Sequence, residues 1–301
     1  MNQYSDQVDL LLQVLPIVAK HKQFALKGGT AINLFIRDMA RLSVDIDLTY
    51  LPLEPRAISL ENIDTGLKSI RDEIERTLTV QVMAPHFKEK LESTLVCANN
   101  KVQIKIEVNH VIRGAVYPCE KRILCNKAQE IFGRFVSLNT LSFADIYGGK
   151  VCAALDRQHP RDLFDIKILL ENEGITDEVR KSFIIYLSSH NRPIVELLNP
   201  NLTDIKDSFE TDFRGMSSVE CNLEELLQAR QELIQIIRQS LTIEEKAFLL
   251  SLKKGTPEWE LLNIPNIDKL PAIQWKLNNI RNMDKQKHIL AVQKLKALLE
   301  I

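Results

Sequence analysis

Two segments near the start of this chain shape the interpretation of the rest: Lys27-Gly28-Gly29-Thr30 and Arg41-Leu42-Ser43-Val44-Asp45-Ile46-Asp47-Leu48. An apolar run precedes the double glycine, a helix over about residues 30–39 follows it, and the Asp-x-Asp lies in a second apolar run. Because side chains alternate faces along a strand, the two aspartates would project from one side, within reach of one metal ion. Glycine has no Cβ, so backbone N–H groups at the turn can approach a phosphate. The combination predicts a site for a nucleoside triphosphate with magnesium.

The hydroxyl of Thr30 has two interpretations. Placed between a strand and a helix, the double glycine would put amides and the positive end of the helix where a triphosphate could lie. Thr30 would then offer its hydroxyl to a phosphate oxygen. Alternatively, Thr30 is simply the N-cap of the helix.

A third carboxylate, Glu107, is expected on a neighbouring strand. Residues 95–98 and 102–108 predict a hairpin with a two-residue turn at Asn99-Asn100. On the second strand Lys105 and Glu107 share a polar face, so Glu107 is either a third metal ligand or an exposed cross-strand charge. Three oxygen ligands, with waters and phosphates, suit Mg²⁺, and Mn²⁺ is the alternative ion. Two such ions could stabilise the attacking and leaving oxygens of a nucleotidyl transfer.

The second half of the chain contributes a lysine and two acids. Lys150 follows Gly148-Gly149, which is unusual inside a helix and suggests close packing that leaves Lys150 pointing into a cleft. The alternative is a solvated lysine. Asp162 and Asp165 share one face of the next helix. Asp165 could orient Lys150 or position an acceptor hydroxyl, or it could form a salt bridge that joins two helices.

Composition bounds the class of protein. The 301 residues are 45% hydrophobic and 26% charged, with a formal net charge of −1, which is ordinary for a globular protein. A nucleic-acid partner would therefore require a local basic patch. No long uncharged apolar stretch predicts a membrane span, and the N-terminus lacks the pattern of a secretion signal. Five cysteines without C-x-x-C spacing are interpreted as reduced thiols, so a cytoplasmic protein is expected.

The pattern of elements predicts an α+β protein in two domains. A small mixed α/β domain over residues 1–135 would hold a mixed sheet with flanking helices. From residue 136 to 301 the pattern becomes mainly helical.

The C-terminal region is rich in basic residues. One acid, Asp284, accompanies a set of six cations: Lys276, Arg281, Lys285, Lys287, Lys294 and Lys296. Such a segment can follow a nucleic-acid backbone, although a solvated helical face is the commoner explanation. Trp259 and Trp275 are interpreted as core residues in preference to stacking platforms.

The same residues resemble a known family. The double-glycine and Asp-x-Asp segments, together with residues 150–157 and 161–166, are similar to the AbiEii/AbiGii toxins, which are bacterial nucleotidyltransferase-like proteins of the DNA polymerase β-like superfamily. Residues 255–259 and 270–276 look like the family's C-terminal region. The resemblance therefore covers most of the chain, and it is the combined pattern that is specific.

The resemblance implies roles for individual residues. Gly28 and Gly29 would form the phosphate-binding turn, and Asp45 and Asp47 the metal-binding pair. Two residues of the helical half would complete the catalytic set: Lys150, in contact with the nucleotide, and Asp165, the acid of the last motif. Glu107 matches the superfamily's third carboxylate strand, where this family varies. Ser43 is expected among the nucleotide-binding residues, and it resembles a position that is modified in some relatives when an antitoxin silences the toxin.

The function expected from this resemblance is that of a toxin in a toxin–antitoxin pair linked to abortive infection and phage defence. It would be an enzyme that moves a nucleotide from a nucleoside triphosphate to RNA, such as the 3′ end of tRNA, and it would have a cognate antitoxin. Two alternatives stay open. One is a triphosphate-binding module that acts through a protein partner without chemistry, and the other is an enzyme that nucleotidylates a small molecule.

Overall fold

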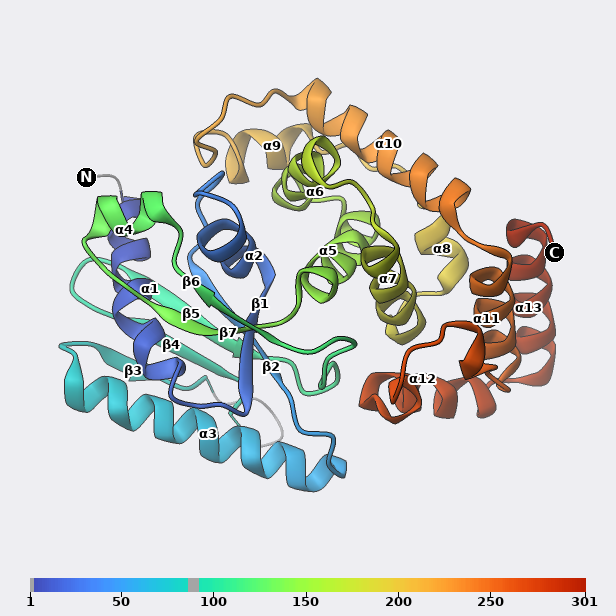
Figure 1. The fold of residues 1–301 in the computed structure, drawn as a ribbon, viewed down its shortest axis with the longest axis horizontal. Coiled ribbons are helices and arrows are strands. Elements are labelled where there is room, and N and C mark those ends of the chain that lie inside the picture. Colours follow the sequence, from blue (N-terminus) through green and yellow to red (C-terminus); the bar gives the residue numbers. More distant parts are fainter. Residues whose placement is uncertain (1–2, 86–91) are drawn as a thin grey trace. The chain divides into compact units, whose positions relative to one another are not determined.

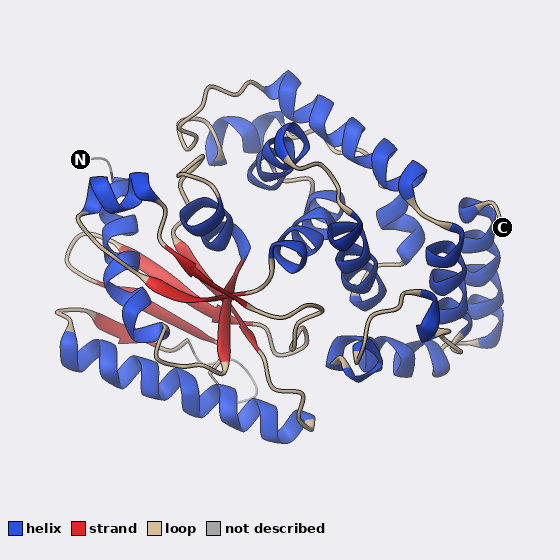
Figure 2. Ribbon diagram, viewed as in Figure 1, coloured by secondary structure: helices blue, strands red, loops and turns tan. Residues whose placement is uncertain are grey.

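The computed structural model of the chain describes residues 3–85 and 92–301. These residues form two units, shown along the chain in Figure 1. Unit 1 comprises Met1–Ser142 and Met216–Val219, and unit 2 comprises Phe143–Gly215 and Glu220–Ile301. The strands belong to unit 1, and unit 2 is built of helices (Figure 2).

Unit 1 contains a seven-stranded mixed sheet with the order β3-β4-β5-β2-β1-β7-β6. Its strands are β1 (Phe24–Lys27), β2 (Asp45–Tyr50), β3 (Gln81–Met83), β4 (Thr94–Ala98), β5 (Gln103–Val108), β6 (Glu120–Ile123) and β7 (Ser137–Thr140). Strand β2 runs antiparallel to β1 and parallel to β5. The parallel pairing is important for the site, because it joins strands that are far apart in the sequence.

Alternation along β2 and β5 separates an apolar face from a polar one. Ile46 and Leu48 on β2 and Ile104 and Ile106 on β5 are all at most 1% exposed. Residues between them point to the opposite face, as the period of two requires. The prediction that β5 is a half-buried strand with one polar face is confirmed.

Helices of unit 1 cover the sheet. They are α1 (Gln3–Val18), α2 (Gly28–Ala31), α3 (Arg56–Thr77) and α4 (Asn126–Phe132), with a π-helical turn, η1 (Ile32–Ile36), directly after α2. Helices α1 and α3 pack against each other, and α2 lies against β1 and β2. The helix predicted over residues 30–39 ends earlier, because Arg37 is extended and Met39 adopts a φ of +57°.

The β4–β5 hairpin has a longer turn than the sequence predicts. Ala98 pairs with Gln103, so residues 99–102 form a four-residue loop. The side chain of Asn99 accepts hydrogen bonds from the backbone N–H groups of Lys101 and Val102, at 2.9 Å each. The hairpin prediction is confirmed, but the two-residue turn at Asn99-Asn100 is wrong. The backbone N–H of Asn99 donates to the carbonyl oxygen of Val102 at 3.0 Å, and the Asn99 side chain, in place of its own carbonyl, accepts from the N–H groups that return toward it.

Unit 2 is a helical assembly. Its elements are α5 (Phe143–Arg157), α6 (Pro160–Asn172), α7 (Asp177–Ser189), α8 (Ile194–Leu198), α9 (Lys206–Asp212), α10 (Leu223–Ser240), α11 (Ile243–Lys254), η2 (Trp259–Leu261), η3 (Ile267–Lys269), α12 (Pro271–Arg281) and α13 (Lys285–Leu299). Capping boxes, Asn222 with Glu225 and Thr242 with Glu245, start α10 and α11. The sequence thus fixes these two helix starts locally.

Close packing of α5 against α7 depends on Gly148. A Cβ at this position would lie 2.6 Å from Ser182 Cβ and 2.7 Å from the backbone N of Phe183, closer than atoms can pack. Gly149 meets nothing within 4 Å. The expectation that the glycine pair allows close packing is therefore confirmed for Gly148 alone.

Two further observations concern the whole chain. Strand β7, which begins after residue 135, belongs to the sheet of unit 1 through β1 and β6. Among the helices of residues 3–85 and 92–301, none has the length and apolar character needed to cross a membrane.

Candidate active site

The double glycine forms the tight turn from β1 into α2, of which it is the first two residues. Gly28 has a φ of +73°, a conformation that side chains with a Cβ rarely adopt. A Cβ at Gly28 would also overlap the carboxylate of Asp47 and lie 3.1 Å from its Cγ. The turn therefore requires glycine for two reasons, and it holds the backbone directly against the second acid of the Asp-x-Asp.

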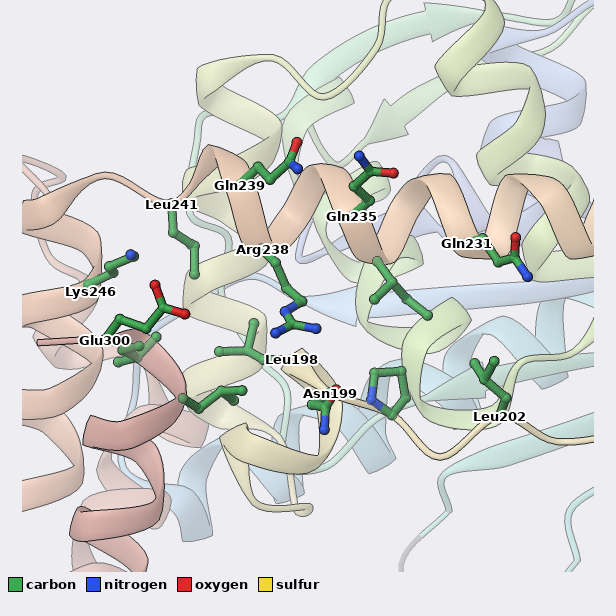
Figure 3. Close-up of a pocket in the computed structure, with 14 residues that line it drawn as sticks. Leu198, Asn199, Leu202, Gln231, Gln235, Arg238, Gln239, Leu241, Lys246 and Glu300 are labelled. Atoms are coloured by element: carbon green, nitrogen blue, oxygen red, sulfur yellow. The ribbon is translucent and has the colours of Figure 1, made fainter.

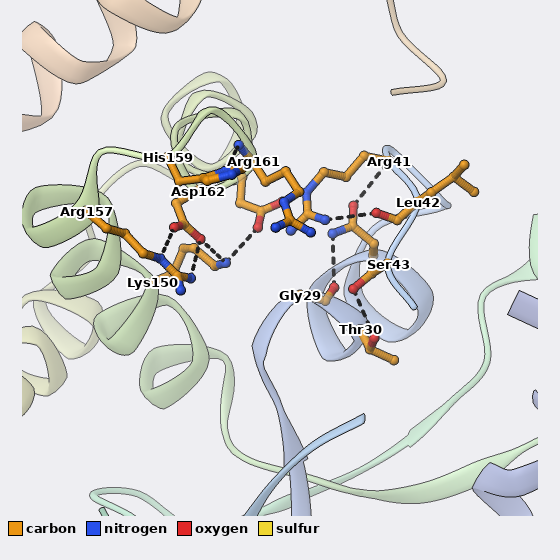
Figure 4. Close-up of polar contacts among 12 residues, drawn as sticks. Gly29, Thr30, Arg41, Leu42, Ser43, Lys150, Arg157, His159, Arg161 and Asp162 are labelled. Atoms are coloured by element: carbon orange, nitrogen blue, oxygen red, sulfur yellow. Dashed lines mark hydrogen bonds and ion pairs between the residues drawn. The ribbon is translucent and has the colours of Figure 1, made fainter. Parts of the chain in front are cut away.

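Thr30 ties the turn to β2. Its hydroxyl donates to the carbonyl oxygen of Asp45 and lies 3.0 Å from Ser43 Oγ. The side chain is fully buried. Lys27 is the N-cap residue of α2, so the N-cap interpretation of Thr30 is wrong. Figure 4 shows Thr30 and Ser43 beside Gly29.

Sheet register brings the predicted carboxylates together. Asp47 pairs with Glu107 across the parallel β2–β5 ladder, and Asp45 pairs with Lys105. Lys27 is the partner of Asp47 on the other side, across β1. Because residues that are partners in a ladder, and residues two apart in a strand, face the same way, all three acids project from one face.

The pKa of Glu107 is raised, in part because other negative charges lie near it. Partial desolvation raises this pKa above its ordinary value, and the charges of Asp47 and Asp45 raise it further. Lys105 and Lys27 act in the opposite direction without cancelling the rise. A divalent cation would relieve this repulsion, and carboxylate oxygens are the donors that Mg²⁺ or Mn²⁺ prefers.

The three carboxylates are suitable metal ligands, but they do not surround one metal position on all sides. Within residues 3–85 and 92–301, the side chains as placed bring no three His, Cys, Asp or Glu groups around a common metal position. Magnesium is commonly held by one or two carboxylates, with waters and substrate phosphates completing its shell. Asp45, Asp47 and Glu107 are the residues that would hold it here, next to the glycine turn.

Arg41 and Asn33 are parts of this site that the sequence reasoning missed. Asn33 is fully buried; its amide donates to the carbonyl oxygen of Gly29 at 3.0 Å, and its Oδ1 accepts from the backbone N–H of Arg41 at 3.1 Å. Arg41 is buried, and its guanidinium lies over the turn, so that a Cβ on Gly29 would be 2.8 Å from it. The sequence does contain one indication of this role for Arg41, since an arginine stands shortly before the Asp-x-Asp and after the double glycine.

A distant segment supports this stretch within unit 1. Residues 216–219 return to form a bridge in which Arg41 pairs with Ser217. The backbone N–H of Leu42 donates to the carbonyl oxygen of Met216 at 2.8 Å, and that of Ser218 donates to the carbonyl oxygen of Ala40 at 2.9 Å. The segment that carries Ser43 toward the acids is thereby anchored by residues more than 170 positions away.

In unit 2, Lys150 is the centre of a buried ion cluster (Figure 4). Its Nζ lies 2.8 Å from Asp162 Oδ1 and 2.9 Å from Asp165 Oδ2. Arg157 adds two hydrogen bonds to Asp162 from its Nε and a terminal nitrogen, at 2.5 and 3.1 Å. Because the Lys150 side chain is only 7% exposed, the alternative of a solvated lysine is wrong.

The cluster joins α5 to α6. Burial alone would raise the pKa of Asp162, but the charges of Lys150 and Arg157 outweigh it and hold the pKa well below its usual range. Asp165 forms the predicted salt bridge between helices. The predicted nucleotide contact of Lys150 and the catalytic role of Asp165 stay predictions, and Asp162 is a partner whose importance the sequence reasoning underestimated.

A separate cavity of about 690 Å³ lies in unit 2, and none of the sequence-predicted residues lines it (Figure 3). Its wall includes one face of α10, with Gln231, Gln235 and Arg238 at helical spacing. Leu198 and Leu202 lie on the opposite side in the close-up. The cavity is therefore distinct from both groups of predicted residues.

Comparisons with known proteins agree with this geometry. A sequence model of the family described as "Nucleotidyl transferase AbiEii toxin, Type IV TA system" matches residues 9–279. Among solved structures, MenT4, a nucleotidyltransferase toxin of Mycobacterium tuberculosis H37Rv, is similar with a TM-score of 0.60 and 13% identity, over 98% of this chain and 93% of that one. No match is found among curated proteins.

The structural similarity concerns the fold, and it confirms the predicted α+β class with a nucleotidyltransferase-like sheet. The sequence match covers most of the chain and confirms the family resemblance. With the glycine turn, the Asp-x-Asp strand and the helical unit in place, the conclusion is that this chain belongs to the AbiEii nucleotidyl transferase toxin family of type IV toxin–antitoxin systems.

Proposed function

We propose that this protein is a Mg²⁺- or Mn²⁺-dependent nucleotidyltransferase that moves a nucleotide from a nucleoside triphosphate to an RNA acceptor, such as the 3′ end of tRNA. One observation carries the proposal. Asp45, Asp47 and Glu107 project from one face of two parallel strands, and Asp47 lies directly against the turn at Gly28. A triphosphate bound at the turn would have its charged oxygens beside these acids.

The chemistry is a displacement at the α-phosphorus. The acceptor hydroxyl oxygen forms a bond to that phosphorus while the bond to the bridging oxygen of the β-phosphate breaks, and pyrophosphate leaves. Glu107 would either help to hold the ion or take the hydroxyl proton, the two roles that a carboxylate can have beside the Asp-x-Asp. The divalent ion would supply charge compensation for the phosphate oxygens.

Positioning provides most of the expected rate enhancement, as in other phosphoryl transfers. The backbone at Gly28 and Gly29 binds the phosphates, and the buried Thr30 keeps the turn in register with Asp45. Because these contacts are local to unit 1, the site can be tested without assumptions about unit 2.

The biological role that we propose follows from the family. The protein would act in the cytoplasm as the toxin of a pair, modify RNA that the cell needs for translation, and be silenced by a cognate antitoxin. Abortive infection, in which such a toxin limits phage growth, is the proposed setting.

Transfer of label tests this function. The purified protein is incubated with total tRNA, Mg²⁺ and each α-labelled nucleoside triphosphate in turn, and labelled RNA is measured on a gel. We expect one or more triphosphates to label RNA, and Asp47→Asn to abolish the labelling. Asp72→Asn is the matched control, because that side chain is 71% exposed on α3 and its replacement removes the same charge.

Two results would contradict the proposal. Tight triphosphate binding with label that stays free in the presence of tRNA would indicate a binding module that acts through a partner. Label that appears on a small molecule, with a resistance phenotype on expression, would indicate the other alternative.

A further inference from the structure

The cavity of about 690 Å³ in unit 2 is lined in part by carboxamide side chains (Figure 3). Gln231, Gln235 and Gln239 reach it from α10, and Asn199 reaches it from the residue after α8. Within residues 3–85 and 92–301, none of these four side chains has a polar partner. A carboxamide both donates and accepts hydrogen bonds, so all four can bind a ligand that offers both kinds of group.

The glutamines of α10 are spaced like the repeat of an extended peptide. Gln231, Gln235 and Gln239 lie four residues apart, so the helix rises by about 6 Å from one to the next. An extended chain repeats every two residues, over about 6.6 Å. Successive carboxamides can therefore reach successive main-chain N–H and C=O groups along one edge of such a peptide.

Leucines form an apolar part of the same wall. Leu198, Leu241 and Leu299 are at most 8% exposed, whereas Leu202 is 55% exposed. Alternate side chains of an extended peptide point the same way, so those on one face would pack on these leucines. A ligand that covered Leu202 would also remove apolar surface from water, which is favourable.

The charged side chains at the cavity favour an acidic ligand. Arg238 extends from α10 toward Asn199, and Lys246 and Glu300 lie at one end of the close-up (Figure 3). In the part of the chain that the structure describes, Arg238 and Lys246 have no ion-pair partner. Two cations with one acid leave an excess of positive charge. A carboxylate offsets such a charge, and it matches the planar guanidinium of Arg238 with two parallel hydrogen bonds.

The cavity wall offers no stacking platform for the bases of a nucleic acid. None of the described residues that line it is aromatic. Trp275, 51% exposed on α12, is not among them, and the core interpretation is wrong for Trp275. Trp259 packs on Phe248 with ring centroids 5.8 Å apart. Since single-stranded RNA is recognised largely by stacking of its bases, the cavity favours a peptide over RNA.

We propose that this cavity binds an extended peptide segment of a partner protein, with apolar side chains on one face and an acidic residue that pairs with Arg238. The main chain of the segment would bond to the carboxamides of α10. From Gln231 to Gln239 the helix rises by about 12 Å, which corresponds to about four residues of an extended chain. The site requires neither triphosphate nor metal, so it does not depend on the proposed reaction.

Binding of a labelled peptide tests the site. An acetylated hexapeptide in which leucine alternates with aspartate carries fluorescein, and its fluorescence anisotropy is followed as full-length protein is added. We expect saturable binding. A peptide of the same composition, with its leucines and aspartates in two blocks, should bind at least about tenfold more weakly, because it cannot place apolar side chains on one face.

Methylation of the peptide backbone tests whether the main chain is recognised. Two further forms of the alternating peptide are N-methylated, one at its leucines and the other at its aspartates. Each form loses the N–H donors along one edge of the extended chain. One of the two forms should bind at least about tenfold more weakly, because only one edge faces α10.

Variants of the cavity wall locate the binding. Gln235→Ala should weaken binding of the alternating peptide about three- to tenfold, whereas Gln228→Ala, on α10 outside the cavity, should change it less than about twofold. Arg238→Gln should weaken binding at least about tenfold and reduce its dependence on salt. Lys254→Gln removes the same charge outside the cavity and should leave both unchanged. All four side chains are exposed, so the variants should unfold at the temperature of the wild type.

Three results would overturn the proposal. The first is an alternating peptide that does not bind saturably, or that binds no better than the block peptide and both N-methylated forms. The second is wild-type peptide binding by Gln235→Ala and Arg238→Gln, which would place the peptide elsewhere. The third is displacement of the peptide by single-stranded RNA whose own binding these two variants weaken, which would assign the cavity to nucleic acid. Labelling of tRNA by the active site is measured separately, so failure of either hypothesis is recognisable.

Discussion

Replacing Lys150 by methionine tests the buried ion cluster of unit 2. Methionine keeps the length and apolar stem but removes an ammonium that lies 2.8 Å from Asp162 and 2.9 Å from Asp165. The three side chains are only 7%, 3% and 1% exposed, so solvent would compensate little of the loss. Breaking a buried pair costs about 3–5 kcal/mol. Arg157 keeps its bonds to Asp162, so that carboxylate retains a charged partner in the variant.

The expected effect is large enough to measure by thermal unfolding. With about 2–4 °C lost per kcal/mol for a unit of this size, the Tm of unit 2 should fall by about 6–20 °C. Arg214→Gln is the surface control, since it breaks an ion pair whose side chains are 66% and 41% exposed and should cost less than about 1 kcal/mol. The double variant Lys150→Met/Asp165→Asn should recover part of the loss, because it also removes the carboxylate charge that the Lys150 ammonium had offset.

The result that refutes this reasoning is a Tm for Lys150→Met within the range of the surface control. The same variant, measured below its Tm, also tests the predicted nucleotide contact. If it binds nucleoside triphosphate as tightly as the wild type does while folded, Lys150 is a structural cation and the predicted contact is wrong. If binding is lost while the fold is intact, Lys150 has both roles.

Three other predictions follow from the structure. Gly28→Ala should be destabilised by about 1–3 kcal/mol because its φ is +73°, and it should also lose triphosphate binding because the new Cβ displaces Asp47. Gly133→Ala is the control, since Gly133 has a φ of +60° with nothing within 4 Å, so only its backbone should be strained. Equal triphosphate binding in the two variants would refute the role of the turn. Asp47→Asn should lower the pKa of Glu107 toward its ordinary value, as followed by carboxyl ¹³C NMR, and an unchanged pKa would show that the two charges do not interact. The pKa of Asp162 is depressed in the folded state, so the stability that its carboxylate contributes should be complete above about pH 4 and be lost as the pH falls below that. The free energy of unfolding in urea should therefore fall on acidification for the wild type and fall less for Asp162→Asn. An equal dependence on pH in the two proteins would contradict this.

Several elements could be predicted from the sequence because their causes are local. The period-two alternation around Ile104 and Ile106 encodes a strand with one buried face wherever that strand pairs. The buried residues Ile63, Leu67, Ile70 and Ile74 recur at helical spacing along α3, which is a local cause of the same kind. Strand β6 and helix α4 were missed, since the four residues of β6 alternate only between partly exposed and exposed positions and carry no apolar signal.

The residues of the candidate site likewise divide into those that local sequence reveals and those that long-range pairing places. The double glycine and the Asp-x-Asp could be recognised in isolation, because a turn that needs glycine and two acids on one strand face follow from the backbone itself. That Glu107 is the partner of Asp47 could only be guessed, since 60 positions separate them and the β2–β5 ladder sets their register.

Local chemistry, written in neighbouring residues, determined the family, the glycine turn and the faces of the strands. Only tertiary packing decided that Asn33 and residues 216–219 hold the Arg41 segment at the turn, and that Lys150 is enclosed by two carboxylates. The physical reason is that burial and long-range pairing depend on what the rest of the chain places around a residue, whereas dihedral preferences and side-chain periodicity belong to the residue and its immediate neighbours.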